Sequence, residues 1–235
     1  MCPSNDSFLS ASLDDTVKLW DLRSSSPQGN LNLHGAYLTA YDPSASVIAI
    51  ASPPTQSILL YDLRNFDKPP FATFDLQDIE RRYSHYGQRQ GEGWTSLEFS
   101  NNGKYILLGT SGPGHYVLDA FEGELEAYLH RPQGPTPFPS MLQANGSPAT
   151  HQTASLQGDA CFTSDGRYVI SGSNQPGLIA WDVDQGQKRG DGRMEPMTDL
   201  PGPKCSTVAA VNPRYNLIAT AASEVILWLP DPDLA

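Results

Sequence analysis

The sequence predicts an all-β repeat protein whose sheets are arranged radially, and three observations support this prediction. Five segments share one pattern: an apolar strand, a polar or Gly/Pro turn, and a second apolar strand, which is typical of a hairpin. No segment has a convincing helical period. The chain also has 20 glycines and 20 prolines in 235 residues, which indicates many turns. The hairpins span residues 8–23, 47–64, 105–121, 168–183 and 217–230.

A further strand precedes four of the hairpins and ends in a turn rich in Asn, Asp, Pro or Gly. These first strands occupy residues 36–46, 94–104, 159–167 and 206–216. Candidate outer strands follow at residues 30–35, 70–76, 124–130 and 194–200. Three inner strands and one outer strand are the content of a propeller blade. The units fall near residues 1–35, 36–76, 94–130, 159–200 and 205–230.

One position recurs in the third strand of every unit. It is occupied by Trp20, Tyr61, Leu118, Trp181 and Trp228, at spacings of 41, 57, 63 and 47 residues. A WD-type blade takes roughly 40 to 45 residues, so the two long intervals contain insertions. The insertions are residues 78–93 and 131–153, and their polar, Gly-, Gln- and Pro-rich composition leads us to expect flexible loops.

The net charge is −11 and the sequence pI is about 4.7. This disfavours direct binding to nucleic acid or to an anionic membrane, because both need clustered Lys and Arg. Three widely spaced cysteines predict neither a disulfide framework nor a zinc site, and they suit a reducing compartment. No run of 18 apolar residues and no signal peptide is visible.

No motif indicates catalysis. The five histidines have no metal-ligand spacing, and the chain contains neither a nucleophile elbow nor a Walker sequence. The Gly-rich stretch at residues 109–116 lies between two strands, so we interpret it as a hairpin turn rather than a phosphate-binding loop. Cys161 and Cys205 lie in strand patterns and are expected to be core thiols. We therefore expect no catalytic residue, no cofactor and no metal.

In WD-type repeats the third-strand Trp packs between blades and joins a buried hydrogen-bonded set. The other members are a second-strand Ser or Thr, an Asp from the intervening turn and a His before the first strand. The structural residues assigned here are Ser12, Asp14 and Trp20, then His34, then Tyr61, then Ser173 and Trp181, and finally Ser223 and Trp228. The set is incomplete in most units, so stability must depend more on apolar packing between blades.

Four stretches then carry a family resemblance: YDLRNFDKPPFATF (61–74), WTSLEFSNNGKYILLGT (94–110), VLDAFEG (117–123) and ILWLP (226–230). They resemble the small WD-repeat propeller subunit of the COMPASS-type histone lysine methyltransferase complex. In fungi the family's protein is also similar to a subunit of the cleavage and polyadenylation factor. The resemblance implies a seven-bladed, non-enzymatic nuclear scaffold. It implies binding to a segment of the methyltransferase and, in some members, to the phosphorylated RNA polymerase II tail.

The turns that follow the third strand offer candidate contacts for a partner. Two of them begin with the same D-L-R sequence, which contains Arg23 in the first unit and Arg64 in the second. Arg64 and Lys68, with Asp67 between them, suit an acidic or phosphorylated segment. The alternative is that each Arg pairs with a neighbouring Asp. The candidate partner-binding residues are Arg23, Arg64, Asp67 and Lys68.

The strands account for about five blades, whereas the resemblance implies seven. We therefore expect an open ring that lacks its N-terminal part, with Met1 an internal methionine of a longer protein. Two other function classes stay open. A propeller hydrolase would need carboxylates or histidines that converge on the central channel. A ubiquitin-ligase substrate receptor would need a module that docks onto the ligase, and none is visible.

Overall fold

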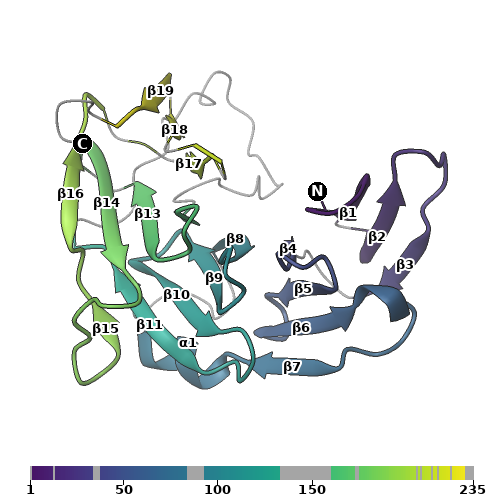
Figure 1. Cartoon of the computed structure of the whole chain (residues 1–235). Helices are drawn as coiled ribbons and strands as arrows, with labels where there is room; N and C mark the ends of the chain where they lie inside the picture. The colour runs from purple at the N-terminus through teal and green to yellow at the C-terminus, as the bar shows by residue number, and fades with distance from the viewer. Residues whose placement is uncertain are drawn as a thin grey trace, which may run out of the picture.

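In the computed structural model, strands make up nearly all of the regular secondary structure, and their five sheets follow one another around an open arc (Figure 1). The described residues are 2–12, 14–33, 38–83, 93–132, 160–172, 175–204, 206, 208–212, 214–215, 217–222 and 224–230. No helix among them is long and apolar enough to cross a membrane. The predicted all-β class is confirmed.

The first two sheets form one half of the arc. The first contains β1 (Ser7–Ala11), β2 (Thr16–Asp21) and β3 (Gly29–Asn32), in that order. The second contains β4 (Leu38–Tyr41), β5 (Val47–Ser52), β6 (Ser57–Asp62) and β7 (Ala72–Asp75), with the short 3-10 helix η1 (Leu63–Asn65) after β6. Every pairing in them is antiparallel, so each sheet is a meander.

The remaining sheets complete the arc. The third contains β8 (Trp94–Phe99), β9 (Tyr105–Thr110), β10 (Gly114–Asp119) and β11 (Leu125–His130), with β15 (Arg193–Met194) added beside β11. The fourth contains β12 (Ala160–Phe162), β13 (Tyr168–Gly172), β14 (Gly177–Asp182) and β16 (Thr198–Pro201). The fifth contains β17 (Val208–Val211), β18 (Ile218–Ala221) and β19 (Val225–Trp228).

The first strands of the sheets lie towards the centre of the arc. β4 packs beside β8, β8 beside β12, and β12 beside β17, whereas β1, which packs beside β4, is equivalent to a second strand because it pairs with the strand that carries Trp20. A row of adjacent first strands is the arrangement at the axis of a propeller. In Figure 1 the arc stays open between the first sheet and the fifth.

The third-strand position identified in the sequence occupies the same register in every sheet. Each residue pairs with an apolar residue on the second strand: Phe8 with Trp20, Ile48 with Tyr61, Ile106 with Leu118, Val169 with Trp181, and Ile218 with Trp228. This shared register shows that the five residues are structurally equivalent despite their unequal spacing.

The equivalent side chains pack against the preceding sheet. Trp181 is completely buried, in a cluster that contains Leu107, Val117 and Leu129 of the third sheet. Tyr61 lies in a cluster with Val17 of the first sheet. Leu118 likewise packs with Ile58 and Leu60 of the second sheet. Trp228 packs with Ile170 and Leu178 of the fourth sheet.

The insertion at residues 78–93 begins with a helix, so the expectation of a flexible loop was wrong for its first part. Residues Gln77–Tyr83 form α1, in which Glu80 and Tyr83 are buried. Glu80 accepts a hydrogen bond of 2.5 Å from Trp94 Nε1, and Tyr83 stacks on Tyr128 with ring centroids 4.2 Å apart. The buried contacts of Glu80 and Tyr83 stabilise the helix although the segment as a whole is polar in composition. Residues 84–92 lie outside the described residues.

The expected outer strand at residues 194–200 is divided between two sheets. β15 pairs in parallel with β11 of the third sheet, whereas β16 pairs with β14 of its own sheet. The Tyr83 hydroxyl donates a hydrogen bond to the Asp191 carbonyl, and Tyr128 N–H donates one to the Gly192 carbonyl at 3.0 Å. The segment before β16 therefore links α1, the third sheet and the fourth.

Arg131, at the start of the second insertion, is also buried rather than solvated. Its Nη2 donates a hydrogen bond of 2.9 Å to the Thr110 carbonyl and another to the Gly112 carbonyl. Burial lowers the pKa of Arg131 to about 10. The rest of this insertion, from residue 133 onwards, lies outside the described residues.

Replacement of Trp181 by Ala should lower the free energy of unfolding by about 3–5 kcal/mol, because it leaves a cavity between the third and fourth sheets. Urea denaturation followed by circular dichroism measures this. Leu227→Ala is the control, because Leu227 is 62 % exposed and its loss should change stability by less than about 0.5 kcal/mol. Equal effects of the two substitutions would contradict the assigned role of Trp181.

Candidate functional site

The turn between β6 and β7 carries three of the four predicted partner-binding residues. Asp62 caps η1, because its Oδ1 accepts a hydrogen bond of 2.9 Å from the backbone N–H of Arg64. Its Oδ2 accepts a second bond, of 2.6 Å, from Asn65 Nδ2. Both carboxylate oxygens of Asp62 are therefore used within the turn, and these bonds lower its pKa, with the positive charges of Arg64 and Lys68 contributing less.

Phe66 anchors this turn to the preceding blade. Its side chain is buried in the cluster that contains Val17, and it lies directly over Gly29 in β3. A Cβ atom on Gly29 would lie only 2.4 Å from the Phe66 ring, so a larger residue there would displace the ring. The anchor leaves Arg64, Asp67 and Lys68 exposed on the outer rim.

Arg23 and Arg64 differ although they share the D-L-R sequence. Arg23 forms a bidentate ion pair with Asp21, with its Nε 2.9 Å from Oδ1 and its Nη2 2.7 Å from Oδ2. This pair lowers the pKa of Asp21 to about 2. Among the described residues, no carboxylate forms an ion pair with the Arg64 side chain, because Asn65 occupies the second oxygen of Asp62. The paired alternative thus applies to Arg23, while Arg64 keeps its guanidinium available.

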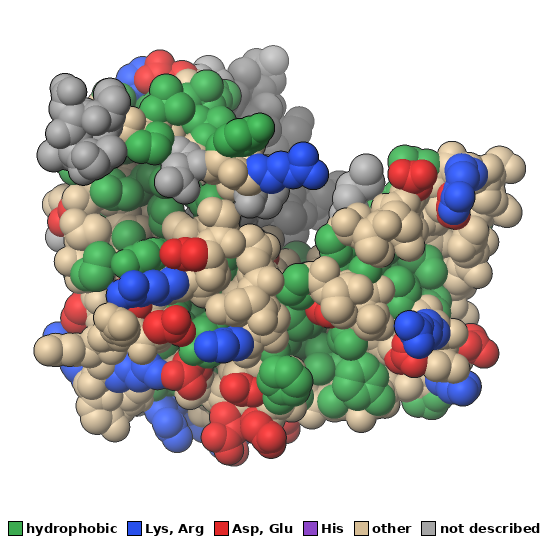
Figure 2. Space-filling model, viewed as in Figure 1, with side chains coloured by type: hydrophobic (Ala, Val, Ile, Leu, Met, Phe, Trp, Pro, Cys, Tyr) green, Lys and Arg blue, Asp and Glu red, His purple; other side chains and the backbone are tan. Residues whose placement is uncertain are grey.

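Charges of both signs are mixed elsewhere on the surface. On the face drawn in Figure 2, Lys and Arg side chains lie among Asp and Glu, with hydrophobic side chains between them. A nucleic-acid-binding surface would instead show a continuous basic stripe. Among the described residues, no group of three His, Cys, Asp or Glu side chains is arranged to hold a metal ion.

The buried hydrogen-bonded set uses a different serine from the one predicted. Trp20 Nε1 donates a hydrogen bond of 2.8 Å to Ser10 Oγ, not to Ser12. Ser10 lies two residues beyond Phe8, the pairing partner of Trp20, whereas Ser12 lies past the end of β1. The prediction of Ser12 was wrong by one period of the strand. The correct serine can be chosen only when the pairing register of β1 and β2 is known.

The same offset recurs in the fifth sheet. Trp228 Nε1 donates a hydrogen bond of 2.9 Å to Thr220 Oγ1, and Thr220 again lies two residues beyond the pairing partner of the Trp. The predicted Ser223 lies outside the described residues, as do Ser173 and His34.

Asp14 stabilises its own turn rather than the tryptophan set. Its Oδ1 accepts bonds from the Thr16 N–H at 3.2 Å and the Thr16 hydroxyl at 2.6 Å, and the side chain is exposed. Asp14 bonds Thr16 and pairs with Lys18, whereas Trp20 bonds Ser10, so Asp14 and Trp20 share no hydrogen bond in the described part of the chain. The predicted membership of Asp14 in a buried set was therefore wrong.

His115, which the sequence placed in a Gly-rich turn, lies within β10 and is fully buried. Its Nδ1 accepts the Thr110 N–H at 3.0 Å, so the proton must be on Nε2, which donates to Ser171 Oγ at 3.0 Å. Burial, with a smaller contribution from the charge on Arg131, lowers the pKa of His115 well below its usual value. The neutral ring therefore links the third and fourth sheets beside Trp181.

The two blades without a tryptophan replace the polar pair with an apolar one. Ile50 and Leu108 occupy the positions equivalent to Ser10, opposite the strands that carry Tyr61 and Leu118. Leu118 cannot donate a hydrogen bond, so a hydroxyl at position 108 would be buried without a partner. An apolar residue is therefore favoured there. The Trp–Ser and apolar pairs are thus two solutions to the same packing problem.

Ser10→Ala should lower the free energy of unfolding by about 1 kcal/mol, because it removes the hydrogen bond from Trp20. Ser12→Ala is the matched control and should change it by less than about 0.5 kcal/mol, since Ser12 is exposed. Denaturant titration of the two variants measures the difference. A larger effect of Ser12→Ala would restore the assignment that the sequence suggested.

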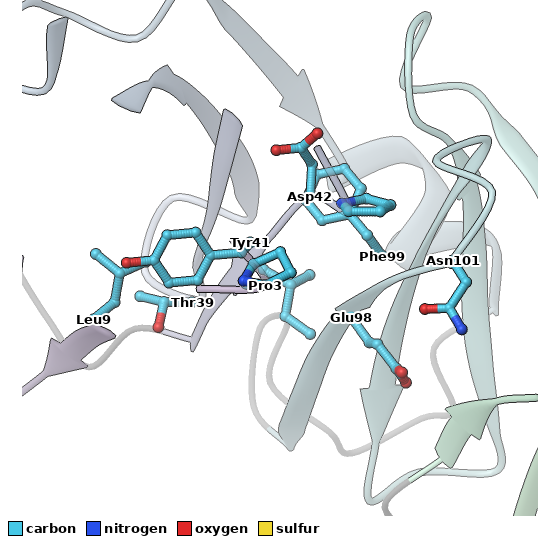
Figure 3. Close-up of a pocket in the computed structure, with 11 residues that line it drawn as sticks. Pro3, Leu9, Thr39, Tyr41, Asp42, Glu98, Phe99 and Asn101 are labelled. Carbon is cyan, nitrogen blue, oxygen red and sulfur yellow. The ribbon is translucent and has the colours of Figure 1, made fainter. Parts of the chain in front are cut away.

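A pocket of about 400 Å³ lies at the inner strands, between the first three sheets. Figure 3 shows Glu98 and Asn101 on one side of it, and Pro3, Leu9, Thr39 and Tyr41 on the other. Glu98 is partly buried, and its Oε2 accepts a hydrogen bond of 3.1 Å from the Phe162 N–H of the fourth sheet. Sequence analysis missed Glu98, because alternation along a strand cannot show that its polar side faces a channel.

Burial raises the pKa of Glu98 to about 7, and the bond from Phe162 lowers it only in part. The folded protein therefore retains a proton on Glu98 at pH values where the unfolded chain has lost it. Between about 4.5 and about 7 the folded state binds more protons, so its stability falls as the pH rises.

Glu98→Gln should remove this pH dependence. The stability of the wild-type protein relative to the variant should fall as the pH rises from about 4.5 to about 7. Thermal denaturation of both proteins across this range measures the effect. A difference that stays constant with pH would show that Glu98 titrates normally.

The chain is similar in sequence to known WD-repeat proteins. Residues 1–21, which contain β1 and β2, match the model of the WD domain, G-beta repeat. The fold is an open WD-type β-propeller. The expected resemblance is also confirmed, because the relatives that match along almost the whole chain are WD-repeat proteins.

Three relatives are informative. WD repeat-containing protein 82 of Drosophila melanogaster is 36 % identical over 97 % of the chain, and COMPASS component SWD2 of Saccharomyces cerevisiae is 34 % identical over 98 %. Set1 complex component swd2 of Schizosaccharomyces pombe is 28 % identical over 96 %. The chain spans only 61 %, 63 % and 66 % of the length of these proteins, respectively.

Proposed function

We propose that this chain acts as a non-catalytic WD-repeat scaffold in a COMPASS-type histone methyltransferase complex, and therefore in the nucleus. The observation that carries the proposal is the similarity to the COMPASS and Set1 complex components over at least 96 % of the chain. The fold is compatible with it, because the rims and turns of a propeller can present contact surfaces to protein partners.

The exposed rim turn supports a specific contact surface. Arg64 and Lys68 lie on a turn that Phe66 holds rigidly against the preceding blade, and Asp67 between them is also exposed. An unpaired guanidinium on a fixed backbone suits a carboxylate or a phosphate. We assign this turn to a segment of the methyltransferase or to the phosphorylated tail of RNA polymerase II.

The double substitution Arg64→Glu and Lys68→Glu should reduce co-purification of the methyltransferase subunit by about tenfold or more, because it reverses two charges at the contact. The melting temperature should not change, since both side chains are exposed. Affinity purification of a tagged chain, with quantitative mass spectrometry of the bound proteins, measures this.

The control variant carries Lys104→Glu and Arg214→Glu, which also lie on exposed turns. Both variants have the same net charge, −15 in place of −11, so a general charge effect would appear in both. Undiminished recovery of the methyltransferase with the rim variant would reject the rim turn as its contact. Recovery of cleavage and polyadenylation subunits without any methyltransferase would favour the other assembly that the resemblance allows.

A further inference from the structure

The partly buried carboxylate of Glu98 has no counter-charge among the described residues. In the described part of the chain, it accepts one hydrogen bond, from the Phe162 N–H to Oε2. None of the described residues that line the pocket is a Lys, Arg or His. An ionised carboxylate withdrawn from water is costly unless a cation or several donors accompany it. Within the part of the chain that the structure describes, this carboxylate therefore has no counter-charge.

The neighbouring strands bring no positive group that could complete it. β4 and its end carry Tyr41 and Asp42, β9 carries Tyr105, and β12 carries Cys161. Burial raises the pKa values of Tyr41 and Tyr105, so both are neutral near pH 7. Only burial and the Phe162 bond act on the pKa of Glu98, so no charged group of the described chain influences it appreciably.

Asp42 does not compete with Glu98 for a ligand. Its Oδ1 accepts hydrogen bonds from the backbone of Ser46 and Val47, and its Oδ2 accepts two from Ser44. These bonds hold the turn after β4 and occupy both oxygens. Glu98 is therefore the carboxylate in the pocket that is open to a new partner.

The remaining lining suits the stem and head of a long cationic side chain. Tyr41 provides aromatic surface, which attracts cations, and Leu9 provides aliphatic surface for a methylene stem, whereas Leu97 and Phe99 are buried in the core on the other face of β8. Thr39 and Asn101 add neutral polar groups. The volume of about 400 Å³ lies within the usual range for ligand sites, roughly 300–1,000 Å³.

We propose that this pocket receives the side-chain cation of a lysine or arginine from a basic segment of a partner protein, with Glu98 as the counter-ion. The site is separate from the rim turn, because it lies on the inner strands β4 and β8 whereas Arg64 and Lys68 follow β6. Binding here does not depend on which complex the chain joins. The acidic inner pocket and the basic outer turn would take partner segments of opposite charge.

The test uses the whole chain and three capped peptides, Gly-Lys-Gly, Gly-Arg-Gly and the uncharged Gly-norleucine-Gly. We expect the Lys or Arg peptide to bind measurably in the millimolar range or better, and the norleucine peptide to bind about tenfold more weakly. Nuclear magnetic resonance titration measures both the affinities and the location, through shifts of the backbone signals of Glu98 and Phe162. The two cationic peptides distinguish an ammonium from a guanidinium ligand.

Glu98→Gln should weaken the cationic peptide by about tenfold or more while it leaves the norleucine peptide unaffected. The amide oxygen can still accept the Phe162 N–H, so the variant should fold, and its circular dichroism spectrum checks this. Glu122→Gln is the control, because Glu122 is exposed and does not line the pocket. It should leave all three affinities unchanged.

The affinity should also follow the ionisation of Glu98. A cation binds the ionised carboxylate, so a group that titrates near pH 7 should bind about tenfold more tightly at pH 8 than at pH 6. Glu98→Gln should abolish this difference. The proposal is overturned if no cationic peptide binds, if norleucine binds equally well, or if Glu98→Gln and wild type bind the cationic peptides with equal affinity.

Discussion

The structure depends on one repeated contact, in which a large side chain from the third strand of the second to fifth sheets packs into the face of the sheet before it. Trp181 shows the contact most completely, because it is fully buried among residues of the third and fourth sheets. Tyr61, Leu118 and Trp228 make equivalent contacts from the same register. Each sheet alone would expose an apolar face, so stability comes from stacking neighbours around the axis. Size and position at this point matter more than the identity of the residue.

In two blades a hydrogen bond from the packed tryptophan to a second-strand hydroxyl reinforces that packing. Trp20 and Trp228 each bond a hydroxyl two residues beyond their strand partner, whereas the blades with Tyr61 and Leu118 have apolar side chains there. The fourth blade is a third variant, in which Ser171 bonds the neutral, buried His115 of the neighbouring blade. The hydroxyls of Ser10, Thr220 and Ser171 are all hydrogen-bonded, but in the fourth blade the buried Trp181 Nε1 has no hydrogen-bond partner among the described residues.

The two candidate binding sites follow from the same framework. On the outer rim, Phe66 uses the interface between blades as an anchor and so fixes a turn that presents Arg64 and Lys68. On the inner side, closely packed first strands enclose Glu98 and let it bridge to Phe162 of the next blade. One site is basic and exposed, and the other is acidic and partly buried. A scaffold with both could hold two partner segments of different charge without any moving part.

The sequence by itself determined the all-β class, the hairpins and the third-strand position, because period-2 alternation, turn residues and repeat spacing are local signals. It misplaced Ser12 by two residues, since the partner of Trp20 depends on strand register. It also missed α1, which two buried side chains hold against another blade. The shared D-L-R sequence also did not separate Arg23 from Arg64, because the difference comes from a local side-chain contact, in which Asn65 bonds an oxygen of Asp62. By contrast, nothing local distinguishes Glu98 from a solvated strand residue: its burial comes from strands distant in the sequence, and burial is what shifts its ionisation.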